Sequence, residues 1–144
     1  MTDTKTNIKK PVQSKVYNLK TAMLEFQKLS VTAKKDGKNP HFRSNYSTLE
    51  SVITAVNQGN QFGLFFTQEI DYVYTSHMET KSEVVVVTTL RHVVDDATYV
   101  SKLPIIMSQQ NMENPQKIGS AITYAKRYTL QAVYGLPSED DDGL

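Results

Sequence analysis

The apolar positions in the first part of the chain follow the spacing of α-helices. The pattern over Tyr17–Lys35 repeats every three or four residues and predicts a first helix. Gly37 and Pro40 follow it, and such residues are typical of a helix end. Ser47 with Glu50 three residues later has the pattern of a capping box, which predicts the start of a second helix. This part of the chain therefore predicts two helices joined by a loop.

Beyond Gly63 the apolar residues alternate with polar ones, which is the pattern of β-strands. The alternation predicts strands over residues 64–74, 84–94 and 97–106, the last of them interrupted at Pro104. Asp95 and Asp96 lie between the second and third strands, where such residues favour a tight turn. Because the connections are short, we expect the three strands to form an antiparallel meander.

The last apolar segment returns to helical spacing. Asn114 is a good N-cap, and Pro115 suits the first helical position. Gly135 favours a left-handed C-cap directly after Tyr134. The order of elements predicts the fold class α+β: a three-stranded antiparallel β-meander followed by a long helix, a β-β-β-α core, with two preceding helices.

A helical projection of the last helix separates two kinds of side chain. At about 100° per residue, small and apolar residues share one side, which predicts close packing on the sheet. That side consists of Ile118, Ala121, Ile122, Ala125, Thr129, Ala132 and Val133. The opposite side consists of Ser120, Tyr124, Arg127 and Gln131. Lys126 and Tyr128 lie on the flanks, so the outer surface of the helix combines cations with aromatic rings.

The Lys126–Arg127 pair lies between two tyrosines and suits contact with nucleic acid. Ammonium and guanidinium groups neutralise phosphates, and tyrosine rings stack on unpaired bases of any sequence. A solvated cationic helix face with rings packed at its edge is the alternative. Tyr124, Gln131 and Tyr134 are also candidates for contact with a neighbouring subunit.

The loop His41–Tyr46 repeats this composition, with a cation, an amide and two rings. It follows a run of lysines that includes Lys35 and Lys38. Loops carried by a rigid scaffold often form binding sites. The alternative is a structured connection whose ring, Phe42 or Tyr46, packs into the core.

The net charge of +1 conceals an uneven distribution. Residues 1–46 hold ten Lys or Arg and three acidic residues, a balance of +7, whereas the segment Glu139–Asp142 carries −4. We predict a flexible basic arm over residues 1–14, one domain over 15–137 and an acidic tail over 138–144. The basic half suits a polyanionic partner, and a solvated basic face with a disordered acidic tail is the alternative. The acidic segment has three open roles: recruitment of a partner protein, competition with DNA for the basic groove, or weak binding of a divalent ion.

Enzymatic chemistry is not indicated. His41, His77 and His92 are far apart in the sequence, and His92 falls on an apolar strand face, where a core histidine is expected. There is no H-E-x-x-H and no phosphate-binding loop, which argues against metal catalysis and ATP use. The 144 residues contain no Cys, which excludes disulfides. No apolar run approaches the roughly 18 residues of a membrane span, and the N-terminus lacks a signal-peptide pattern.

Two segments carry a family resemblance. NPHFRSNYSTLESVITAV resembles the NPhFkSkYa-type opening, and GSAITYAKRYTLQAVYGLPSEDDDG the GSAlTYarRYaL-type helix, of the ERF family of phage and prophage single-strand annealing recombinases. The resemblance spans roughly residues 17–143. It implies a cytoplasmic protein of the bacterial host cell that binds single-stranded DNA and anneals complementary strands in phage recombination. It implies no ATP, no cofactor, no metal and no catalytic residue.

The resemblance also implies partners and candidate contacts. Related annealing proteins have a β-β-β-α core and assemble into rings or filaments, so a homo-oligomer is expected. A host or phage single-strand binding protein or an exonuclease is a candidate for a further partner. Passive coating of single strands, or recruitment of a partner without annealing, is the alternative. The candidate DNA-binding residues for the phosphate backbone are Lys126, Arg127, Arg43, Lys38 and Lys35. Those for stacking or framing the groove are Tyr46 and Tyr124.

Overall fold

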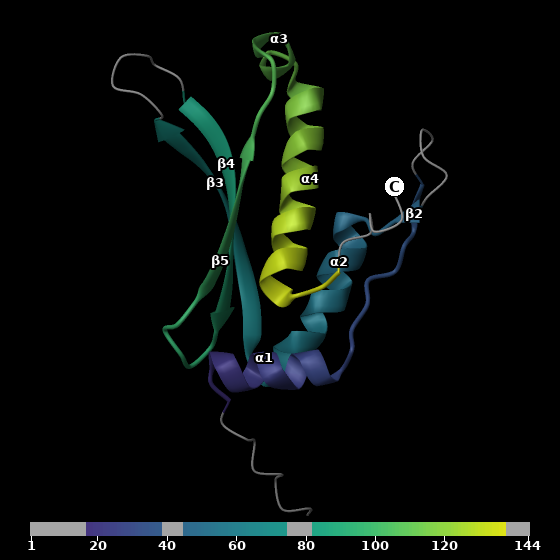
Figure 1. Ribbon diagram of the computed structural model, residues 1–144, viewed down its shortest axis with the longest axis vertical. Coiled ribbons are helices and arrows are strands. Elements are labelled where there is room, and N and C mark those ends of the chain that lie inside the picture. Colours follow the sequence, from purple (N-terminus) through teal and green to yellow (C-terminus); the bar gives the residue numbers. More distant parts are fainter. Residues whose placement is uncertain (1–16, 39–44, 75–81, 138–144) are drawn as a thin grey trace, which may run out of the picture.

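The computed structural model describes residues 17–38, 45–74 and 82–137 (Figure 1). The predicted basic arm, Arg43 and the acidic segment Glu139–Asp142 lie outside the described residues, so these predictions stand untested. Within the described part, none of the helices combines the length and apolar character that a membrane span needs.

The described residues form an α+β fold with the predicted β-β-β-α core. Three strands of an antiparallel sheet follow one another along the chain, a long helix follows them, and two helices precede them. In chain order the elements are α1 (Leu19–Lys28), β1 (Gly37–Lys38), β2 (Asn45–Tyr46), α2 (Leu49–Val56), the 3-10 helix η2 (Asn57–Phe62), β3 (Leu64–Tyr74), β4 (Ser82–His92), β5 (Tyr99–Ile105), α3 (Gln109–Met112) and α4 (Pro115–Tyr134). The predicted fold class is therefore confirmed.

The main sheet is a meander in the order β3-β4-β5. Its register places Leu64 opposite His92 and Leu90 opposite Tyr99, so these side chains share one face. Helix α4 packs along that face against β4 and β5 (Figure 1). No described element covers the other face. The outer edges of β3 and β5 pair with no described strand.

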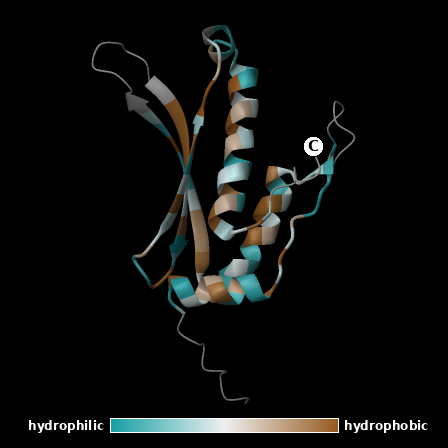
Figure 2. Cartoon of the chain, viewed as in Figure 1, coloured by the Kyte–Doolittle hydropathy of each residue, from teal (hydrophilic) through white to brown (hydrophobic). Residues whose placement is uncertain are grey.

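Two apolar clusters hold α4 against the rest of the molecule. The larger cluster joins the C-terminal half of α4 to α1, α2 and the adjoining ends of β3 and β4, with Phe26, Leu130 and Tyr134 at its centre. The smaller one joins the N-terminal half of α4 to the sheet through Ala125, Val86 and neighbouring residues. In Figure 2 the strongest hydrophobic colour lies on strands and on α2, whereas α4 is pale along most of its length. Its small residues allow a close approach to the sheet, as predicted.

A chain of hydrogen bonds crosses the interface between α4 and the sheet. Gln68 Nε2 donates to Thr88 Oγ1 at 2.9 Å and to the Lys126 carbonyl at 3.0 Å. The Thr88 and Thr129 hydroxyls are 2.6 Å apart, and Thr129 Oγ1 donates to the Ala125 carbonyl at 2.7 Å. Because Thr129 donates its single hydroxyl proton to the Ala125 carbonyl, the Thr88 hydroxyl is the donor to Thr129. The chain fixes the position of α4 along the sheet.

The first helix ends earlier than predicted. Helix α1 spans Leu19–Lys28 rather than Tyr17–Lys35, because Ser30 takes a left-handed backbone conformation with a φ of 50°. Asn18 caps its start, and Asp95 Oδ2 accepts a hydrogen bond from the Leu19 N–H at 3.1 Å. A left-handed residue stops a helix without a glycine or proline, so the sequence pattern did not reveal it.

The predicted capping box at Ser47 and Glu50 is wrong by one residue. Thr48 is the N-cap of α2, and its Oγ1 accepts from the Ser51 N–H at 3.2 Å. Ser47 is buried and donates to the Ala33 carbonyl at 3.3 Å. The short ribbon β1–β2, helix α3 and the helix η2 were not predicted.

Strand boundaries shift by one or two residues from the prediction. Strand β4 spans Ser82–His92, and β5 spans Tyr99–Ile105 without an interruption at Pro104. An edge strand tolerates proline because one of its sides needs no ladder hydrogen bond. The predicted tight turn at Asp95 and Asp96 is wrong, because β4 and β5 are joined by the longer connection 93–98, which bends at Val93 and Val94. Within it, Asp95 Oδ1 accepts from the Ala97 N–H at 3.0 Å.

The predicted faces of α4 are wrong near its C-terminus. Gln131 and Tyr134 are buried, with 3% and 1% exposed, whereas Ala132 is exposed. Helices α1 and α2 surround this end of α4, so its outward side is also covered. Gln131 and Tyr134 are therefore not available for contact with a neighbouring subunit.

Candidate nucleic-acid interface

The Arg127 guanidinium lies among three tyrosine rings. Its Cζ is 4.7 Å from the centre of the Tyr46 ring, 5.5 Å from that of Tyr124 and 5.2 Å from that of Tyr128. Each distance is within the range of a cation–π interaction, worth about 0.5–1 kcal/mol at an exposed site. The rings thus hold a half-buried positive charge in one place.

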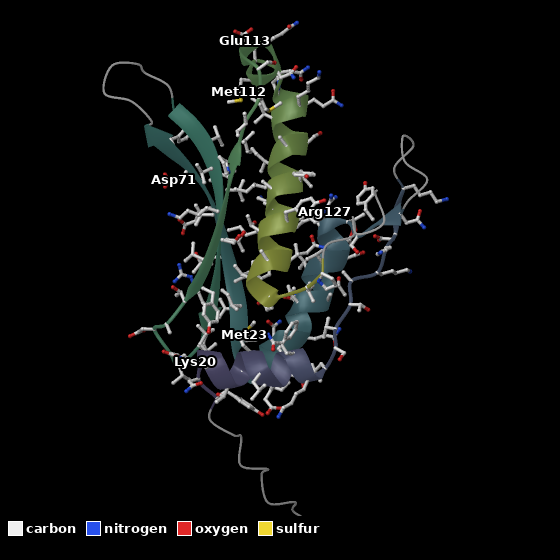
Figure 3. All side chains as sticks on the ribbon, in the orientation of Figure 1. Lys20, Met23, Asp71, Met112, Glu113 and Arg127 are labelled. Carbon is white, nitrogen blue, oxygen red and sulfur yellow. The ribbon has the colours of Figure 1, made fainter. Side chains whose placement is uncertain are left out.

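Helical spacing brings three of these residues together on α4. Tyr124 and Tyr128 are four residues apart, so they meet on adjacent turns, with ring centres 4.4 Å apart. Arg127 lies between them in the sequence and reaches both rings. Figure 3 shows Arg127 on the side of α4 that faces α2 and β2.

Tyr46 comes from the ribbon β1–β2, far from α4 in the sequence. Its ring lies directly over Gly37, the residue opposite it in the ribbon. A Cβ atom added at Gly37 would lie 2.5 Å from the Tyr46 ring, so only glycine permits this contact. Gly37 therefore seats the Tyr46 ring, and the ring reaches Arg127 as a result.

Asp36 connects this ribbon to the start of α2. Its Oδ1 accepts from the Thr48 hydroxyl at 3.0 Å, and the Thr48 N–H approaches it at 3.4 Å. Hydrogen bonds from the hydroxyl of Ser51 first, and then from Thr48, lower the pKa of the Asp36 carboxyl below its ordinary value of 3.8. The ionised carboxylate thus anchors the strand that carries Tyr46.

An open groove lies beside the Arg127 cluster. Its volume is about 600 Å³, within the usual size range of ligand sites. The lining residues are Tyr46, Gln116, Gly119, Ser120, Thr123, Tyr124 and Arg127. Tyr46 forms one wall, and the other described lining residues come from α4. Among the described residues the groove offers rings, an amide, hydroxyls and one cation, a mixture that suits an extended polar ligand.

Lys126 is separate from this groove. It projects from α4 about 100° away from Arg127, its side chain is half-buried, and its carbonyl accepts a hydrogen bond from Gln68 of β3. It is absent from the groove lining. The two adjacent cations therefore lie on different sides of the helix.

Apart from Lys126 and from Arg43, which lies outside the described residues, the predicted contact residues divide into two groups. Arg127, Tyr46 and Tyr124 come together at the groove. Lys38 lies on β1, and Lys35 lies just before it. Both are exposed beside the strand β2 that carries Tyr46, and both lie outside the groove lining. Whether any of these residues contacts DNA stays a prediction.

Several residues of the site were missing from the predicted contacts. Tyr128 completes the ring cluster, and Gln116, Gly119, Ser120 and Thr123 line the groove. The four-residue spacing of Tyr124 and Tyr128 was a sequence signal for the ring cluster. A glycine within a long helix was a sequence signal for the groove.

His92 is a core residue, as expected from its strand face. Its Nδ1 accepts from the Val94 N–H at 3.2 Å, so its Nε2 carries the proton and donates to the Phe62 carbonyl at 2.9 Å. Within residues 17–38, 45–74 and 82–137, no group of three His, Asp or Glu side chains could hold a metal ion.

Comparison with known proteins gives one match. The family model described as ERF superfamily matches residues 19–143, which is most of the chain. Neither a search of curated proteins nor a search of solved structures finds a match. The matched range includes the sheet, α4 and every residue of the groove.

Proposed function

The chain belongs to the ERF superfamily, a family of DNA-binding recombination proteins, and we propose that it anneals complementary single strands of DNA without ATP during phage recombination. The proposal places it in the cytoplasm of the bacterial host. Annealing forms and breaks no covalent bond, so the proposed activity needs no catalytic residue and no cofactor. Its physical requirements are to hold a strand extended and to screen the repulsion between phosphates.

The Arg127 cluster is the observation that supports this proposal. A guanidinium held among three rings is already oriented before a ligand arrives, so less conformational entropy is lost on binding. Phosphates bind to such a planar cation, and bases stack on exposed rings. Tyr124 is 51% exposed, which leaves ring surface for a base.

Lys126, Lys35, Lys38 and Arg43 have a different proposed role. Lys126 lies on the flank of α4 toward β3, and the other described lysines are exposed beside β1. Lys126, Lys35 and Lys38 lie outside the described lining of the Arg127 groove, and Arg43 lies outside the described residues. We assign these cations to phosphates on either side of the nucleotide that occupies the groove.

The proposal includes assembly of several copies. The free edges of β3 and β5 are different surfaces, so pairing one with the other joins copies head to tail. Such contacts produce closed rings or open filaments. Ile70 and Tyr72 near the β3 edge are 47% and 61% exposed, which suits burial in such a contact.

The first experiment measures binding and annealing by the full chain. A fluorescent single strand is titrated over a series of salt concentrations, and complementary strands are mixed with and without protein. We expect log affinity to fall linearly with log salt, with a slope of about −0.7 per phosphate contact. We also expect the complementary strands to pair faster with the protein than without it. Affinity without faster pairing would support passive coating, and salt-independent binding would contradict the phosphate contacts.

Arg127→Ala tests the site itself. We expect weaker binding and a salt slope smaller by about 0.7, with an unchanged circular dichroism spectrum. Arg91→Ala is the matched control, because Arg91 lies on the sheet face that no described element covers and bonds to Thr67. The double variant Lys126→Ala/Arg127→Ala should abolish annealing. Normal binding by that folded double variant would refute the assignment.

A further inference from the structure

Gly119 is an unusual residue for its position. It is the fifth residue of α4 and is exposed, with a helical turn on each side. A Cβ atom added there would meet nothing within 4 Å. Glycine weakens a helix interior relative to alanine, and no contact within the described structure requires it. One use of glycine in proteins is to let a ligand approach the backbone closely.

The surface next to Gly119 is the groove described above. Ser120 and Thr123 contribute small side chains beside it, and the Thr123 hydroxyl donates to the Gly119 carbonyl at 3.0 Å. The Tyr124 ring contacts Tyr128 and remains half exposed on the groove. The glycine thus keeps open the floor of a groove that has an aromatic wall.

We propose that this groove is a subsite for one unpaired nucleobase of the bound strand. The base lies over Gly119, stacks on Tyr124, and places its neighbouring phosphate at Arg127. The proposal rests on the proposed binding of single-stranded DNA and identifies which part of the nucleotide the groove accepts. One anchored base per copy leaves the remaining bases free to pair.

The chemistry of the lining favours a base over a phosphate alone. A groove for phosphates would be lined mainly by cations and N–H donors, whereas the described lining of this one includes a single guanidinium. The Gln116 amide and the Ser120 hydroxyl both donate and accept hydrogen bonds, as base edges require. Stacking needs a flat exposed ring, and Tyr124 supplies one.

The test fills the groove without removing any of its binding groups. Gly119→Leu places a bulky side chain over the floor, and leucine favours the helix more than glycine does. Ala132→Leu is the matched control, because Ala132 is an exposed residue of α4 outside the groove. Each protein is titrated with an intact oligonucleotide and with one of equal length and charge that carries abasic sites throughout.

The two oligonucleotides separate the possible outcomes. We expect Gly119→Leu to weaken binding of the intact strand by roughly 5- to 150-fold, the range that corresponds to one lost stacked base. We expect no effect on the abasic strand, and none of Ala132→Leu on either. Equal weakening on both strands would mean that only the sugar–phosphate backbone enters the groove. No weakening on either would mean that the groove is unused, and both results overturn the proposal.

Binding by the unmodified protein separates this inference from the proposed function on which it rests. If the unmodified protein binds neither strand at low salt, the proposed binding of single-stranded DNA fails. If it binds intact strands and Gly119→Leu binds them equally well, only the base subsite fails. Gly119→Ala completes the series. It should raise the melting temperature because of its helix propensity, and it should weaken binding of the intact strand less than Gly119→Leu does.

Discussion

The two halves of α4 belong to one helix but have opposite surroundings. From Thr129 to Tyr134 the helix is enclosed by the sheet, α1 and α2, and five of these six residues are buried. From Pro115 to Tyr124 it touches the sheet on one side and leaves the groove open on the other. The C-terminal half therefore holds the helix against the rest of the molecule, and the N-terminal half exposes a surface for binding.

Arg127 lies where the two halves meet. Its position is set by the packed half, because the Thr88–Thr129 pair and the Gln68 bond hold the adjacent turn. Its surroundings belong to the open half, through Tyr46 and Tyr124. A binding residue at this boundary combines a rigid backbone with an accessible side chain.

The largest contrast is expected between Leu130→Ala and Ser120→Ala. Leu130 is fully buried in the larger cluster, so its truncation should lower the free energy of unfolding by about 2–5 kcal/mol. Ser120 is exposed, so its change should stay within about 0.5 kcal/mol. Urea unfolding followed by circular dichroism measures both. Similar losses of unfolding free energy for the two variants would contradict the distinction between a packed and an open half of the helix.

The hydrogen-bond chain between the halves gives a smaller effect. Thr129→Val leaves the buried Thr88 O–H without its acceptor, while the Thr88 oxygen still accepts from Gln68, at a cost of about 1–3 kcal/mol. The double variant Thr88→Val/Thr129→Val should cost less than the sum of the two single changes, because it removes both partners. Additive costs in urea unfolding would show that the two hydroxyls do not interact.

Tyr134→Phe should leave stability unchanged or raise it. The Tyr134 hydroxyl is buried and has no hydrogen-bond partner in the described part of the chain, while its ring packs edge-on against Phe26 and Phe66. Phenylalanine keeps those ring contacts and removes an unsatisfied group, which typically costs about 1–3 kcal/mol when buried. Urea unfolding at neutral pH measures the difference, and a clear loss of stability would reveal a partner for the hydroxyl.

The same variant has a pH signature. Burial raises the pKa of Tyr134 above its ordinary value of 10.0, because the charged form is desolvated in the fold. The unfolded chain therefore releases this proton first, and stability falls as pH rises above 10.0. Tyr134→Phe should lose less stability over that range than the unmodified protein. Parallel losses would assign the alkaline sensitivity to other groups.

Local sequence signals were enough to predict the order of the elements. Asn114, Pro115 and Gly135 marked the ends of α4, which spans Pro115–Tyr134 as predicted. Alternating apolar residues predicted the three strands. These signals act over a few residues, so they can be found without knowledge of the remaining structure.

The environment of α4 could not be predicted in the same way. An angular projection assigns Gln131 to the outer side, yet α1 and α2 bury it. The meeting of Arg127 with Tyr46 depends on the ribbon β1–β2, and that ribbon depends on Gly37. Such contacts join distant segments, and no local pattern indicates them.

The smallest effect is expected at Asp36, on the open side of the molecule. Because hydrogen bonds from Ser51 and Thr48 lower its pKa below 3.8, its ionised form stabilises the fold above that pH, and this contribution is lost as pH falls through the lowered pKa. Acid should therefore loosen the ribbon of Tyr46 before it affects the cluster around Leu130. Amide exchange at Tyr46 and Thr48 should rise at a higher pH than exchange at Leu130. In Asp36→Asn, which cannot ionise, that early rise should disappear, and its persistence would mean that another group supports the ribbon.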